Sequence, residues 1–84
     1  MEEYIVTFRT VTPAQRGESV LQNMQISSSL QRTPRWMEAQ GCGYSLRVKC
    51  EDIQTVIKCL RDKNVHFRKI YRKKENGAVE EVRL

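Results

Sequence analysis

The chain has 84 residues, with 15 lysines and arginines against 10 acidic residues, so its formal charge is +5. This length fits one domain, residues 1–84, with a small core. No run of about 18 apolar residues exists that could span a membrane, and the start MEEYIVTFRT lacks the basic and apolar segments of a secretory signal. We therefore expect a cytoplasmic protein, and the positive charge is compatible with an anionic partner.

Three cysteines, Cys42, Cys50 and Cys59, are an odd number, and their spacing matches neither a disulfide framework nor a CxxC metal site. Unpaired cysteines are typical of a reducing compartment. The sequence therefore predicts free thiols, no metal site and no cofactor.

The first half of the chain predicts a strand, a helix and a second strand. Residues 4–9 (YIVTFR) are apolar on both faces, which is typical of a central strand. A threonine cap and Pro13 in the first helical position predict a helix over residues 13–24. Gly17 inside this helix indicates a close approach of helix and sheet. The expected buried stripe is Ala14, Gly17, Val20 or Leu21, and Met24.

A polar strand and a long connection follow. Residues 26–32 (ISSSLQR) suit a sheet edge better than its middle. Residues 33–43 are long for a connection between hairpin strands, and extra loop length often serves a function. Trp36 and Met37 in this connection either cover the core or present a docking surface.

The second half of the chain repeats the order strand, helix, strand. Residues 44–50 (YSLRVKC) alternate, with Cys50 on the core face and Ser45, Arg47 and Lys49 outward. Residues 51–64 predict a helix with acidic residues in its first turn and a left-handed end at Asn64. Its buried face is expected to comprise Ile53, Val56, Ile57 and Leu60, with Cys59 at the border.

Residues 65–71 predict the last main strand, and Asn76-Gly77 predicts a hairpin turn to a fifth strand over residues 79–83. A frayed tail is the alternative for this C-terminal segment, residues 72–84. A basic run marks the same region and indicates either a protected edge strand or a binding patch. The run comprises Arg68, Lys69, Arg72, Lys73 and Lys74.

The element order over residues 4–71 predicts an α+β ferredoxin-like split βαβ sandwich, in which an antiparallel sheet of order 4-1-3-2 carries both helices on one face. In that topology Cys42, between Gly41 and Gly43, lies near the N-terminus of the first helix. Helix termini and cations lower the pKa of a thiol, and strand four would bring His66 to the same end. An inert cysteine in a turn, and an exposed histidine without a partner, are the plain alternatives.

The segments YIVTF, Pro34-Arg35 and Cys42-Gly43-Tyr44-Ser45-Leu46-Arg47 resemble a small bacterial family of selenium/sulfur carrier-like proteins. The resemblance covers about residues 4–71. It implies that Cys42 is the carrier thiol and that Gly43, Pro34, Arg35 and Arg47 are its motif companions. Gln40 and Gly41 depart from the family pattern, which usually has serines just before the cysteine.

The sequence thus favours a carrier that holds sulfur or selenium on Cys42 and passes it between donor and acceptor proteins, rather than a turnover enzyme. The alternative is a binding or regulatory module of the same fold, which takes a small anion, a protein or RNA, or assembles into a homodimer. The third strand offers no aromatic pair for stacking bases, which argues against nucleic acid. No membrane partner is expected.

Overall fold

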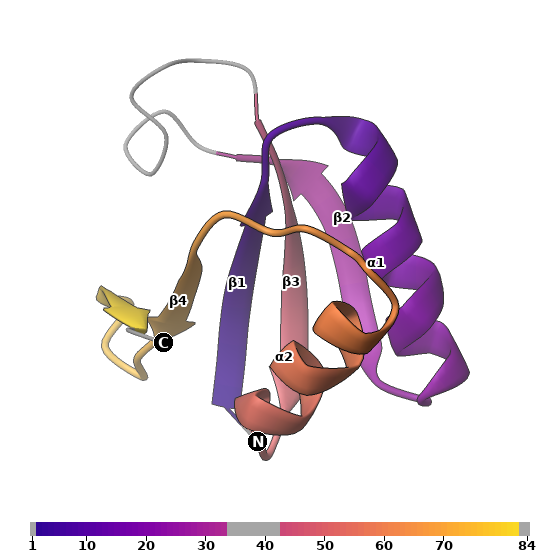
Figure 1. The fold of residues 1–84 in the computed structure, drawn as a ribbon. Helices are drawn as coiled ribbons and strands as arrows, with labels where there is room; N and C mark the ends of the chain where they lie inside the picture. The colour runs from indigo at the N-terminus through magenta and orange to yellow at the C-terminus, as the bar shows by residue number, and fades with distance from the viewer. Residues whose placement is uncertain (1, 34–42, 83–84) are drawn as a thin grey trace.

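The computed structural model describes residues 2–33 and 43–82, and over this range the chain forms two helices on a five-stranded antiparallel sheet (Figure 1). The sheet order is β2-β3-β1-β4-β5. This order contains the predicted 4-1-3-2 arrangement and adds β5 beside β4, so the ferredoxin-like prediction is confirmed with an extra strand. The elements are β1 (Glu2–Phe8), α1 (Val11–Asn23), β2 (Ser27–Arg32), β3 (Tyr44–Cys50), α2 (Ile53–Asp62), β4 (Ile70–Lys73) and β5 (Val79–Val82).

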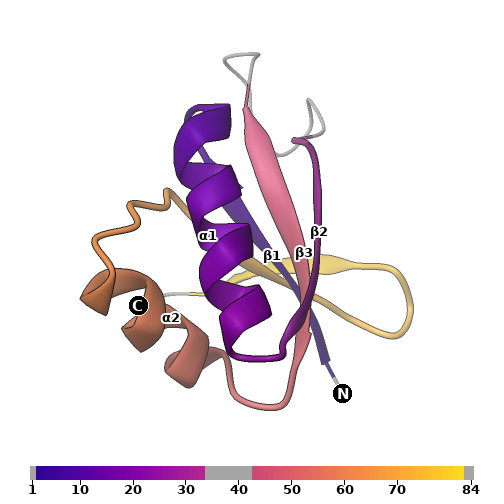
Figure 2. The same ribbon diagram turned by 90° about the vertical axis from the view of Figure 1, so that its right-hand side faces the viewer.

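The central strand is β1, as its apolar composition predicted. It pairs with β3 over seven residue pairs on one side and with β4 over four on the other, and Tyr4 to Phe8 are all buried. Both helices lie on the same face of the sheet (Figure 2). The core between the helices and the sheet includes the fully buried side chains of Val6, Phe8, Leu21, Leu46 and Leu60.

The helix α1 begins two residues before the predicted start. Thr10 is in the cap position with an extended backbone, and Pro13 is the third helical residue instead of the first. The prediction was wrong because the missing N–H of proline is tolerated anywhere in the first turn, where backbone N–H groups have no helical partner. The predicted stripe is confirmed, with Ala14, Gly17 and Leu21 buried and Val20 and Met24 partly buried.

The close approach predicted at Gly17 is present. A Cβ atom at this position would lie 3.2 Å from the Phe8 ring and 3.2 Å from the Leu46 side chain. Both distances are shorter than ordinary contact, so the absence of a side chain lets α1 pack against β1 and β3.

The strand β2 pairs only with β3, which confirms its place at the sheet edge. In β3 the predicted alternation holds for Leu46, Val48 and Cys50, which are buried, and for Arg47 and Lys49, which are exposed. Ser45 differs from the prediction, because it has no exposed surface although its neighbours on that face are exposed.

The helix α2 is shorter than predicted, and the acidic residue at its start, Asp52, is the N-cap. The Asp52 carboxylate accepts hydrogen bonds from the Gln54 N–H (3.0 Å) and the Thr55 hydroxyl (3.1 Å), while the first turn itself holds no acidic residue. The predicted face is buried, Cys59 is half-buried at its border, and Asn64 has a left-handed φ of 58°.

The last main strand was predicted too early. The strand β4 begins at Ile70, whereas residues 65–69 form an irregular connection. Thr7 accounts for the difference, since its hydroxyl accepts a hydrogen bond from the Lys69 N–H (3.0 Å) and its carbonyl accepts one from the Arg68 N–H (2.8 Å). The Thr7 side chain thus binds the Lys69 N–H, which would donate to a β1 carbonyl in regular strand pairing.

The C-terminal hairpin is formed, with Gly77 at a φ of 87° in its turn and β5 paired to β4. Because β5 covers β4, the basic run does not lie on a sheet edge, and that prediction was wrong. Acidic residues of β5 instead face the cations of the run. Glu80 pairs with Lys74 (2.9 Å) and Arg72 (3.9 Å), and Glu81 pairs with Lys69 (3.8 Å).

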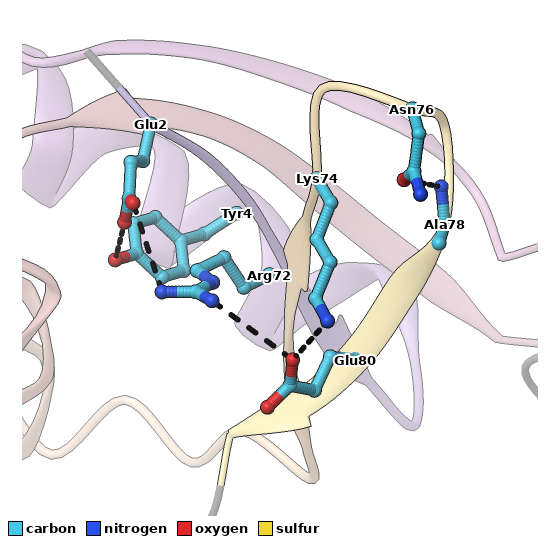
Figure 3. Close-up of polar contacts among 7 residues, drawn as sticks. All are labelled: Glu2, Tyr4, Arg72, Lys74, Asn76, Ala78 and Glu80. Atoms are coloured by element: carbon cyan, nitrogen blue, oxygen red, sulfur yellow. Dashed lines mark hydrogen bonds and ion pairs between the residues drawn. The ribbon is translucent and has the colours of Figure 1, made fainter.

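A chain of polar contacts links the hairpin to the start of β1 (Figure 3). The Tyr4 hydroxyl donates a 2.6 Å hydrogen bond to Glu2, and Glu2 lies 3.6 Å from Arg72. The hydrogen bond to Glu2, followed by burial, raises the pKa of Tyr4 to about 12. This network joins the hairpin to the central strand.

We expect Gly17→Val to lower the free energy of unfolding by about 1–3 kcal/mol, because the added methyl groups would overlap Phe8 and Leu46. Gln15→Val, at an exposed position of the same helix, is the matched control and should have a much smaller effect. Urea denaturation of both variants measures the difference. Equal stability of the Gly17 variant and the parent protein would contradict the close packing described here.

We expect Glu2→Gln to lower the pKa of Tyr4 from about 12 towards 10.0, because the carboxylate favours the protonated phenol. The pKa of Tyr4 in the folded protein lies above the ordinary tyrosine value of 10.0, so this interaction stabilises the fold fully below pH 10.0 and is lost as the pH rises through about 12. Alkaline titration of tyrosinate absorbance, with Tyr4→Phe to assign the signal, measures the shift. A titration unchanged by Glu2→Gln would show that the contact does not control Tyr4.

Candidate functional site

Three strands meet at the end of the sheet beside Gly43, the residue that follows the candidate thiol in sequence. Phe8, the last residue of β1, and Arg32, the last residue of β2, both pair with Tyr44, the first residue of β3. The Thr33 N–H donates a 3.0 Å hydrogen bond to the Gly43 carbonyl, and both residues are buried. The position of Gly43, the residue that follows Cys42, is therefore fixed at this end of the sheet.

Several predicted site residues lie outside the described residues. They are Cys42 itself, its neighbour Gly41, and the motif residues Pro34 and Arg35. Trp36 and Met37 lie there as well. The roles of these residues stay predictions. The structure describes Thr33 and Gly43, the residues on either side of this segment.

The N-terminus of α1 lies at this same end of the sheet, directly after β1 (Figure 1). Thr10, its cap residue, makes no side-chain capping hydrogen bond, and the first turn contains no acidic residue. Helix N-termini carry unpaired N–H groups and a partial positive charge. Within the described residues, no side chain from the helix itself neutralises this charge.

Two arginines that the sequence analysis did not single out flank Gly43. Arg9 is exposed and follows Phe8, and the Arg32 guanidinium lies 5.8 Å from the centre of the Tyr44 ring. The strand register indicates the positions of both arginines, because residues at the ends of β1 and β2 must lie beside the start of β3. Among the described residues, the helix terminus and these two cations contribute positive charge at this end of the sheet.

Arg47, a predicted companion of Cys42, is bound to another partner. Its Nε donates a 2.8 Å hydrogen bond to Glu3, and its Nη2 lies 2.6 Å from the same oxygen. Arg47 is four residue steps along the chain from Gly43, a strand distance of about 13 Å. Glu3 pairs with Lys49, further along β3, so this contact directs the guanidinium away from Gly43.

His66 is exposed in the connection before β4. This connection joins β1 at Thr7, on the side of β1 opposite to β3. Two strand spacings, about 10 Å, therefore separate it from the strand that Gly43 enters. His66 thus lies on the far side of β1 from β3, and its proximity to Cys42 stays a prediction.

Two buried hydroxyl groups lie close to Gly43. Thr33 Oγ1 and Ser45 Oγ have no hydrogen-bond partner in the described part of the chain, although both residues are buried. A buried hydroxyl without a partner costs about 1–3 kcal/mol, and such groups are uncommon in folded proteins. These two hydroxyl groups are polar atoms near Gly43 that make no hydrogen bond within the described part of the chain.

Cys50, one of the two described cysteines, does not resemble an activated thiol. Cys50 is buried in the core, as predicted, and burial, followed by the nearby Asp52 charge, raises the pKa of its thiol. Cys59 is a half-buried free thiol on α2. A raised pKa lowers the thiolate fraction, so Cys50 is a poor nucleophile.

Over residues 2–33 and 43–82, no group of three histidine, cysteine or acidic side chains is arranged to hold a metal ion. Neither helix in these ranges has the length and hydropathy that a membrane crossing requires.

Comparison with known proteins supports the resemblance seen in the sequence. A family model described as "Putative Se/S carrier protein-like" matches residues 3–72, which is most of the chain and all elements from β1 into β4. The chain matches no curated protein and no solved structure. From the family match, this chain belongs to the Se/S carrier protein-like family.

Proposed function

We propose that the protein carries sulfur or selenium on Cys42, as a persulfide or selenopersulfide, and passes it to a partner protein. Family membership supports a carrier. The observation that carries the proposal for Cys42 is the position of Gly43, which is held between the ends of β1 and β2 beside the N-terminus of α1. Cys42 is bonded directly to this residue.

The chemistry needs a thiolate at an accessible position. The thiolate attacks the outer sulfur of a donor persulfide, an S–S bond forms at Cys42, and the donor S–S bond breaks with release of the donor thiolate. The reverse exchange, with an acceptor thiolate as nucleophile, delivers the atom. Neither step needs an oxidant or a cofactor.

The local charges favour the anionic forms of this cycle. A helix N-terminus and neighbouring arginines lower the pKa of a thiol below its free value of about 8.5. Arg9 and Arg32 supply cations beside Gly43. Neither Gly41 nor Gly43 adds a side chain beside the thiol.

The remaining motif residues enter the proposal through the family resemblance. Arg35 and Arg47 stabilise the anion, and Pro34 shapes the segment before the cysteine. His66, which the predicted topology rather than the resemblance suggested, is the candidate imidazole. Arg47 has to do this while its guanidinium is bound to Glu3, so we expect its effect to be smaller than that of Arg32.

The partners are a sulfur or selenium donor protein and an acceptor protein, and the free thiols require a reducing compartment such as the cytoplasm. The edge of β2 is a place where a second copy could pair to form a homodimer. It has six residues, a single charged side chain and no proline, so it lacks the usual protection of an edge strand. The carrier itself performs no turnover.

We expect Cys42 to react with iodoacetamide with an apparent pKa below about 8.5. Peptide mass spectrometry across a pH series separates its labelling from that of Cys50 and Cys59. Arg32→Gln should raise this pKa because it removes a cation beside Gly43, and Arg47→Gln should raise it less. Lys49→Gln, an equal charge loss at an exposed position of β3, is the control and should leave the value unchanged.

An apparent pKa above about 8.5 would argue against an activated thiol. Equal shifts in the Arg32 and Lys49 variants would show that the net charge of the protein, rather than the end of the sheet, controls the cysteine.

A further inference from the structure

A basic hollow of about 300 Å³ lies where α2 ends and the chain crosses to β4. Two arginines and the histidine line it together with an amide and two apolar side chains, and among the described residues that line it none is acidic. The lining residues are Arg61, Asn64, Val65, His66, Phe67 and Arg68.

Two anchors hold the hollow in shape. At one end, Asn64 adopts a left-handed φ of 58°, its N–H donates to the Arg61 carbonyl (3.0 Å), and the buried Val65 donates to Leu60 (2.8 Å). At the other end, the Arg68 N–H donates to the Thr7 carbonyl (2.8 Å). Residues 66 and 67 therefore cross the surface between two fixed points.

The backbone adds hydrogen-bond donors to these cations. The N–H groups of His66 and Phe67 make no hydrogen bond to any other described residue. The negative end of α2 is also partly compensated, because the Lys63 carbonyl accepts a 3.4 Å hydrogen bond from Arg16 of α1. Arg61, His66 and the two backbone N–H groups therefore present hydrogen-bond donors at this corner.

We propose that this hollow, the 61–68 hollow, binds a small divalent oxyanion of the sulfate or phosphate class. A guanidinium presents paired N–H donors that match two oxygens of such an anion. The argument rests on Arg61, His66 and the two backbone N–H groups. It uses no atom of Cys42, so anion binding and the carrier function can each fail alone.

The position of the hollow connects it to the rest of the fold. The connection 65–69 joins β1 at Thr7, one residue before the Phe8–Tyr44 pair that fixes Gly43. An oxyanion bound in the hollow would lie on the side of β1 opposite to the strand that Gly43 enters.

The test is a nuclear magnetic resonance titration of backbone amides with sodium sulfate, with sodium chloride adjusted to keep the ionic strength constant. We expect saturating shifts in residues 61–68 and none in the hairpin around Lys73 and Lys74. Arg61→Gln and His66→Ala should each weaken binding about tenfold, the effect of losing one hydrogen bond to a charged group.

Lys58→Gln is the matched control, because it removes a charge from an exposed position one turn earlier on α2 and should leave binding unchanged. The parent spectrum of each variant shows that it is folded. Shifts that do not saturate, shifts spread over all basic residues, or equal loss in the Lys58 variant would overturn the proposal. A Cys42→Ser variant that still binds sulfate would separate this site from the carrier function.

Discussion

The pairing of β1 with β3 is the constraint on which the candidate site depends. Seven consecutive residue pairs fix the register, and the last of them joins Phe8 to Tyr44. Since the strands are antiparallel, β3 must begin where β1 ends and where the chain turns into α1. The same pairing brings Arg9 and the N-terminus of α1 to Gly43, and Gly17 keeps the helix close to both strands.

Much of the fold could be predicted because its signals are local. Alternation in residues 44–50, the helical spacing of Ile53 to Leu60 and the Asn-Gly turn each reflect a period or a backbone preference within a few residues. The start of β4 could not be predicted in this way. It depends on the Thr7 hydroxyl, which is 62 residues away in sequence from its partner Lys69.

In the candidate site, too, local sequence signals could be predicted and contacts between distant residues could not. The topology alone placed the entry to β3 beside α1, but the contact of Arg47 with Glu3 joins residues 44 positions apart and has no local signature. Arg9 and Arg32 carry no motif and become visible only when the register is known. Burial of Ser45 also defied the alternation, because a period describes which face a side chain occupies and not what covers that face.

The acidic residues of the C-terminal hairpin pair with one group of the basic residues, those in and next to β4. The family match ends at residue 72, inside β4, so the turn and β5 lie beyond it. Glu80 and Glu81 of β5 pair with Lys69, Arg72 and Lys74. No ion pair between described residues joins Glu80 or Glu81 to Arg9, Arg32 or Arg61, so these two acidic side chains do not neutralise the cations near Gly43 or Arg61 of the 61–68 hollow.

The most direct measurement is the intact and peptide mass of the protein purified from its native cells without reductant. The account predicts a mass gain of one sulfur or one selenium atom, located on the peptide that contains Cys42, removed by thiol reductant and absent from a Cys42→Ser variant. A protein whose Cys42 peptide never carries the added atom, or whose added atom is found on Cys50 or Cys59, would contradict the central claim.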